Sequence, residues 1–165
     1  MHDKTKDYFV DMLFKHISII YKICNMYAVE SERNDLQQEI IYQLWRSFPS
    51  FRGEAKFQTW IYRVALNTAL LGLRVKKIKY TEISEKEINI PYETYNDNDI
   101  NLKVKQLYSH ISKLNHIDKT IIFLYLEQCS YQDISEITGI NKKNISVRLV
   151  RIREKLRKMF KTQTS

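Results

Sequence analysis

Apolar residues recur at steps of three and four through most of the chain, which is the spacing of the buried face of an α-helix. In the first half this spacing predicts three helices, at about 4–27, 35–48 and 56–77. Beyond position 101 it predicts four more, at about 102–112, 116–126, 131–138 and from 142 onward. Few segments alternate with period two, so we expect an all-α fold.

The last two predicted helices have the signals of a helix-turn-helix. Ser130 and Asp133 have the spacing of a capping box, which predicts a helix that starts at Tyr131. Gly139 suits a left-handed helix end, and Asn141 can cap the next helix. A short helix, a Gly turn and a longer helix form the helix-turn-helix motif. The inward stripe of the longer helix is Ile145, Leu149, Ile152 and Leu156.

The segment 80–101 interrupts the helical pattern. It contains Pro91 and carries six acidic residues against the single Lys86. These features are typical of a tether between domains. We therefore expect two small helical domains, 1–79 and 102–165, joined by an acidic linker at 80–101.

The positive charge is concentrated near the C-terminus. Positions 142–161 carry nine basic residues and one acid, a sum of +8 that equals the net charge of the whole chain. Such a helix repels itself and needs an anionic partner, for which DNA phosphate is the obvious candidate. The alternative is a basic helix that is merely solvated, but it would leave the capped helix and Gly turn before it unexplained.

A second basic segment, 63–79, holds five basic residues and no acid. Four aromatic residues lie shortly before it: Phe51, Phe57, Trp60 and Tyr62. Rings beside positive charge suit single-stranded nucleic acid, because bases stack on rings while the backbone follows the charge. The alternative is that Phe57 and Trp60 belong to the hydrophobic core.

The composition argues against several other classes of protein. There is no uncharged apolar run of 18 residues and no secretory signal, so we expect a cytoplasmic protein that is not inserted in a membrane. The two cysteines, Cys24 and Cys129, lie far apart in the sequence and suit buried thiols. Neither they nor the four histidines have the spacing of metal ligands. Carboxylates are not clustered as a metal-dependent nuclease would need. We expect no metal, no cofactor, no small-molecule substrate and no enzyme activity.

Two segments resemble the extracytoplasmic-function sigma factors of bacterial RNA polymerase. Segment 35–77 is similar to region two of that family in its Asp-Leu-x-Gln-Glu start, in Leu44-Trp45, and in Phe-x-Thr-Trp-Ile-Tyr-Arg from Phe57. Segment 114–156 is similar to region four in Tyr-x-x-Ile-Ser-x-x-x-Gly-Ile from Tyr131 and in the Arg series from Arg148. Two motifs in this order are far more specific than a helix-turn-helix alone.

The resemblance implies a promoter-recognition subunit whose partners are core RNA polymerase (its β′ clamp helices and β flap), promoter DNA and an anti-sigma factor. It implies polymerase binding by Asp35, Gln38, Glu39, Gln43, Leu44 and Trp45. It implies that the −10 element is melted and held by Ser50, Phe51, Arg52, Gly53, Lys56, Arg63, Asn67 and Arg74. The residues implied to bind the −35 duplex are Lys142, Lys143, Asn144, Ser146, Val147, Arg148, Arg151 and Lys155.

Within the −35 set, chemistry suggests a division of roles. Asn144 and Arg148 are the side chains best able to read base edges. The other cations, Lys142, Lys143, Arg151 and Lys155, are expected to bind phosphate, which positions the helix without specifying sequence.

Several positions depart from the usual pattern of the family. Leu66 and Leu71 replace residues that are commonly basic and acidic, respectively, and Ser146-Val147 replace a common Lys-Ser pair. Gln128 stands where Gly is usual, at a cost of about 1 kcal/mol if the residue must be left-handed. The competing interpretations are a helix-turn-helix regulator that does not enter polymerase and a nucleic-acid enzyme. The region-two segment argues against the first.

Overall fold

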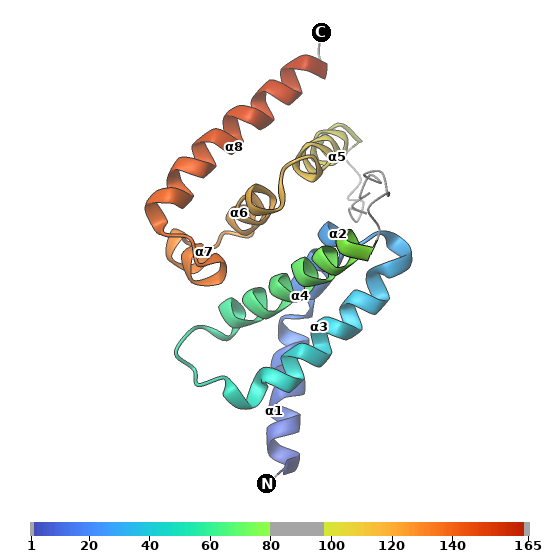
Figure 1. The fold of residues 1–165 in the computed structure, drawn as a ribbon, viewed down its shortest axis with the longest axis vertical. Coiled ribbons are helices and arrows are strands. Elements are labelled where there is room, and N and C mark those ends of the chain that lie inside the picture. The colour runs from blue at the N-terminus through green and yellow to red at the C-terminus, as the bar shows by residue number, and fades with distance from the viewer. Residues whose placement is uncertain (1, 80–97, 164–165) are drawn as a thin grey trace. The chain divides into compact units, whose positions relative to one another are not determined.

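A computed structural model of the chain describes residues 2–79 and 98–163. The regular elements of these two ranges are all helical, which confirms the expected fold class (Figure 1). The chain divides into two compact units, Met1–Lys86 and Glu87–Ser165. Most of the predicted linker, residues 80–97, lies outside the described residues.

The first unit is built on α2 (Ile17–Tyr27), α3 (Arg33–Ser47) and α4 (Phe57–Lys79). Ile23 of α2, Ile40 and Leu44 of α3, and Ile61 of α4 are fully buried and form its core. Short 3-10 turns, Glu30–Glu32 and Phe48–Ser50, lie before and after α3. Ser31 and Asn34 are each of a type that could cap this helix, but α3 begins directly after the first turn without a side-chain cap.

The prediction of a single helix at 4–27 was wrong, because the structure has two helices in this range. α1 (His2–Lys15) ends before α2, and His16 between them has φ −121° and ψ 11°. The Met12 carbonyl accepts a bond from His16 Nδ1 at 2.9 Å, while the His16 backbone N–H bonds the Leu13 carbonyl at 3.0 Å. The histidine ring thus takes the acceptor that its own amide would use in a continuous helix.

The second unit contains α5 (Asn98–Ser112), α6 (His116–Leu126), α7 (Tyr131–Thr138) and α8 (Lys142–Gln163). Its core joins Ile111 of α5, Ile121 and Leu124 of α6, Ile134 of α7 and Ile145 of α8, all fully buried. The expected helix signals are confirmed. Asn115 caps α6, Ser130 and Asp133 form a capping box on α7, and Asn141 accepts from the Asn144 N–H at 2.9 Å.

The burial of α6 differs from expectation. The apolar residues of this helix lie on nearly all its sides, which predicts a buried helix: Ile117, Ile121, Phe123, Leu124, Tyr125 and Leu126. Instead Ile117, Tyr125 and Leu126 are exposed, whereas Lys119 and Thr120 are buried. Its inward face is set by its neighbours α7 and α8 and not by its own apolar residues alone.

Two left-handed residues shape the turns around α7. Gly139 ends α7 with φ 74°, as its sequence position predicted. Gln128, in the turn between α6 and α7, has φ 61° although it carries a side chain. Its N–H donates to the Tyr125 carbonyl and that of Cys129 donates to the Leu124 carbonyl, both at 3.0 Å. This is the Schellman pattern of a helix C-terminus, with Gln where Gly is favoured.

Candidate nucleic-acid and polymerase interfaces

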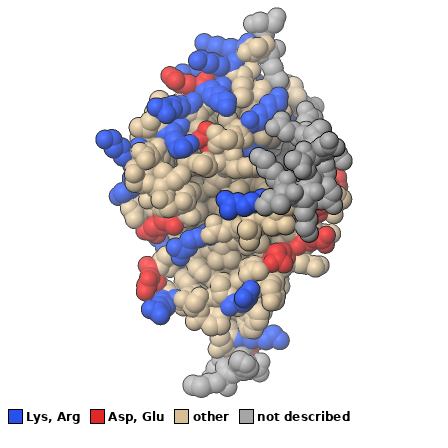
Figure 2. Space-filling model, in the orientation of Figure 1, with Lys and Arg blue, Asp and Glu red and all other residues tan. Residues whose placement is uncertain are grey.

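α8 has one buried and one exposed face. The predicted inward stripe is confirmed, since Ile145, Leu149, Ile152 and Leu156 are all buried. Figure 2 shows Lys and Arg side chains gathered over the region of α8. Of the residues predicted to bind phosphate, all four are exposed: Lys142, Lys143, Arg151 and Lys155. The exposed face is therefore suited to a polyanion.

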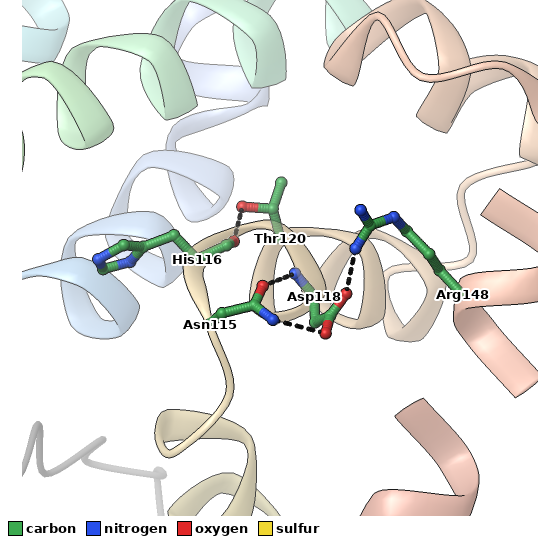
Figure 3. Close-up of polar contacts among 5 residues, drawn as sticks. All are labelled: Asn115, His116, Asp118, Thr120 and Arg148. Atoms are coloured by element: carbon green, nitrogen blue, oxygen red, sulfur yellow. Dashed lines mark hydrogen bonds and ion pairs between the residues drawn. The ribbon is translucent and has the colours of Figure 1, made fainter. Parts of the chain in front are cut away.

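Arg148, predicted to read a base, is half-buried and bonded to another side chain of the second unit. Its Nη1 donates to Asp118 Oδ1 at 2.9 Å, and the two side chains are only 38% and 18% exposed. Asp118 also accepts from the side-chain amide of the α6 cap Asn115 at 2.7 Å (Figure 3). Arg148 thus ties the start of α6 to the flank of α8, a contact that sequence reasoning missed.

A second cation of α8 also has an intramolecular contact. The Arg153 guanidinium lies 4.7 Å from the centroid of the Tyr125 ring on α6. This distance is within the range of a cation–π interaction. Arg148 and Arg153 therefore help to fix α8 against α6, which leaves the outward face to other residues.

The loop before α4 joins an aromatic cluster. Phe51 is half-buried, with its ring centroid 5.4 Å from that of Phe57 and 5.2 Å from that of Trp60. Phe57, Trp60 and Tyr62 are buried in the folded chain, so they support the core interpretation and not base stacking. Phe51 alone among the four has an accessible ring.

The other residues predicted at the −10 element are exposed around this loop and along α4. Ser50, Arg52, Gly53 and Lys56 lie in or beside the loop, and Gly53 has φ 74°. Arg63, Asn67 and Arg74 are exposed on α4 at steps of four and seven, which place them on one helix face. The side chains of Lys76, Lys77 and Lys79 lie outside the described residues.

Leu66 and Leu71, the two residues of α4 that depart from the family pattern, differ in burial. Leu66 is buried, so it contributes to the core and cannot contact DNA as a basic residue would. Leu71 is exposed, one turn after Asn67 and three residues before Arg74. The exposed face of α4 therefore carries an apolar residue between polar ones.

The residues predicted to bind polymerase divide into two groups. Asp35, Gln38, Glu39 and Trp45 are exposed on α3, and Gln43 is half-buried, donating to Glu39 Oε1 at 2.7 Å. Leu44 is fully buried in the core of the first unit. Its assignment as a contact residue is therefore corrected to that of a core residue.

The described ranges hold neither a cluster of metal-ligating side chains nor a membrane-spanning helix. No group of three His, Cys, Asp or Glu side chains in residues 2–79 and 98–163 is placed to hold a metal ion. Burial raises the pKa of the Cys24 thiol to about 11, against a smaller opposing effect of Arg33, so the thiol is protonated at neutral pH. Among the described helices, none is long and apolar enough to cross a bilayer.

Comparison with known proteins adds evidence of family. The family model of sigma-70 region 2 matches residues 15–77, and that of sigma-70 region 4 matches residues 105–156. The chain is 29% identical to the ECF RNA polymerase sigma factor SigW of Bacillus subtilis, covering 94% of this chain and 90% of SigW. It is 31% identical to the ECF RNA polymerase sigma-E factor of Haemophilus influenzae, covering 78% and 74% of the two chains.

A solved structure gives the same fold. The sigma factor RpoE of Bartonella quintana, crystallised with the anti-sigma factor NepR, superposes with a TM-score of 0.79 at 18% identity. The match covers 94% of this chain and 98% of RpoE. Both regions occur here in one chain, in the same order, and over most of the length of these relatives. The chain belongs to the extracytoplasmic-function sigma factors of the sigma-70 family.

Proposed function

We propose that this protein binds core RNA polymerase and directs it to promoters, reading the −35 element as duplex and opening the −10 element. The observation that carries the proposal is the exposed, cation-rich face of α8, set by its buried stripe. A regulator outside polymerase could use the same face. It would have no need for a first unit that matches sigma region 2.

In the −35 interface, the N-terminal half of α8 enters the major groove. Lys142, Lys143, Arg151 and Lys155 bind phosphates, and Asn144, Ser146 and Val147 approach the bases. Arg148 acts as a positioning residue, because its bond to Asp118 fixes the angle between α6 and α8.

In the −10 interface, the half-buried ring of Phe51 receives an unstacked base, which aromatic rings bind through stacking. The remaining predicted residues, which surround the ring in sequence or lie along α4, bind the strand backbone and base edges: Ser50, Arg52, Gly53, Lys56, Arg63, Asn67 and Arg74.

The polymerase contact is assigned to the exposed face of α3, which would bind the β′ clamp helices through Asp35, Gln38, Glu39, Gln43 and Trp45. The second unit would bind the β flap. We place the functional domains at 1–79 and 102–165, with residues 80–101 as linker, of which residues 98–101 form the first turn of α5. The protein would act in the cytoplasm, without catalysis, and RpoE's complex with NepR supports an anti-sigma factor as a further partner.

The test is run-off transcription by core polymerase of the source organism on a library of random upstream sequences, with and without the protein. We expect transcripts that depend on the protein and share two spaced sequence elements. A matched control replaces Arg151 and Lys155 by alanine, which should remove the upstream element from the selected set. Selective binding of duplexes with one element, but no transcript, would identify a regulator instead.

A further inference from the structure

The centre of the outward face of α8 is apolar. Val147 and Val150 are 43% and 55% exposed, whereas Ile145 and Leu149 beside them in sequence are at most 1% exposed. Exposed β-branched residues lower helix propensity and add nothing to the core. Folding of the second unit does not account for two valines at this place.

Charged residues flank the two valines. Lys143 precedes Val147 by one turn and Arg151 follows it by one turn, and both are exposed. Arg148 is turned aside to Asp118, so it does not cover Val147. Cations that bind phosphates on either side would bring the valines between them against the base edges.

The major groove presents one apolar group on its base edges, the C5-methyl of thymine. Residues 147 and 150 are three apart, a rise of about 4.5 Å along a helix, which lies between one and two steps of roughly 3.4 Å between base pairs. Two such side chains therefore match one or two neighbouring base pairs. We propose that Val147 and Val150 contact thymine methyl groups and make thymine a preferred base of the −35 element.

This inference rests on the proposed function of α8, but it makes a separate claim, that an apolar methyl contact selects the base. A site read only through hydrogen bonds would ignore the methyl group. Deoxyuridine distinguishes the two cases, because it pairs as thymidine does and differs only by the missing methyl.

The experiment measures binding of the full chain to its selected −35 duplex by fluorescence anisotropy at one fixed salt concentration, with each thymine replaced in turn by deoxyuridine. We expect one or two neighbouring replacements to weaken binding about fourfold each, or about 0.8 kcal/mol. Val147→Ala and Val150→Ala should each bind more weakly and lose the methyl dependence at one step.

Val75→Ala is the matched control. Val75 is 44% exposed on α4 in the other unit, so the same change should leave affinity and methyl dependence unaltered. A selected duplex that tolerates deoxyuridine at every position, or that contains no thymine, overturns the inference and leaves the proposed function standing. If no duplex is selected at all, the proposed function fails and the inference falls with it.

Discussion

At the scale of single residues, the contact between Asp118 and Arg148 shows why the chemistry of a side chain does not settle its role. Arginine at this position is chemically able to read guanine, and from sequence Arg148 was one of the two best candidates on α8, with Asn144. In the folded chain its guanidinium bonds a carboxylate 30 residues away. Only the packing of α6 against α8 brings the two together, so no local pattern could have revealed the pair.

Replacing Arg148 by alanine should therefore weaken binding to all −35 sequences by a similar factor, because α8 loses its positioning contact. The second unit should also lose about 1 kcal/mol of stability, the value for a partly exposed ion pair. Amide hydrogen exchange of α8 measures the stability, and a double-mutant cycle with Asp118→Ala isolates the coupling.

Arg157→Ala, at an exposed basic residue of the same helix, is the control for stability. If Arg148→Ala instead relaxes the preference at a single base pair, Arg148 leaves Asp118 on binding and reads a base.

Gln128 is a second residue at which stability can be tested. Its φ of 61° is unfavourable for a residue with a side chain, and glycine has no such penalty. Gln128→Gly should raise the free energy of unfolding of the second unit by about 0.5–1 kcal/mol, after the entropy that glycine adds to the unfolded chain is subtracted. Chemical denaturation followed by circular dichroism measures the change.

Gln128→Ala keeps the backbone penalty and serves as the control, for which no stabilisation is expected. A gain with alanine equal to that with glycine would mean that the glutamine side chain, and not the backbone, is the source of strain.

At the scale of elements, the sequence predicted helices that carry local signals and failed where distant packing decides. The caps and turn of α7 and α8 depend on residues three or four apart, and these were correct. The division between α1 and α2 lies at His16, whose ring bonds the Met12 carbonyl. No proline or glycine marks this position in the sequence. The burial of Phe57 and Trp60 depends on contacts with Phe48 across a turn.

The prediction at the scale of elements concerns the loop before α4 and its residue Phe51. Phe51→Ala should reduce opening of the −10 element about tenfold, because base–aromatic stacking contributes on the order of 1–3 kcal/mol. Permanganate reactivity of −10 thymines, in complexes with core polymerase, measures the opening. Binding to the −35 duplex should stay unchanged.

Phe14→Ala is the control, since Phe14 is a 70% exposed aromatic residue of the same unit. Trp fluorescence checks that the first unit remains folded in both variants, because Trp45 and Trp60 both lie in it. Unchanged permanganate reactivity would assign Phe51 to the aromatic core alone.

At the scale of the whole molecule, two separately folded units predict separable functions. Trp45→Ala on α3 should weaken binding to core polymerase at least tenfold, since exposed tryptophans commonly dominate interface energy, and should leave −35 duplex binding intact. Titration of labelled polymerase measures the first and fluorescence anisotropy the second.

Tyr21→Ala, at a residue of similar exposure on α2, is the control. Trp45 also contacts Phe9, at 5.1 Å between ring centroids, so thermal unfolding must show that the variant is folded. Parallel loss of polymerase and DNA binding by a folded variant would contradict the separation.

The division into two units also has a kinetic consequence. When one unit is bound, the covalent connection keeps the other unit nearby, and the second contact forms as an intramolecular event with a raised effective concentration. Two individually weak contacts can then hold the protein on a promoter. An event that breaks either contact reduces the affinity of the protein to that of a single unit. Polymerase that leaves the promoter can therefore release the protein without a separate dissociation step.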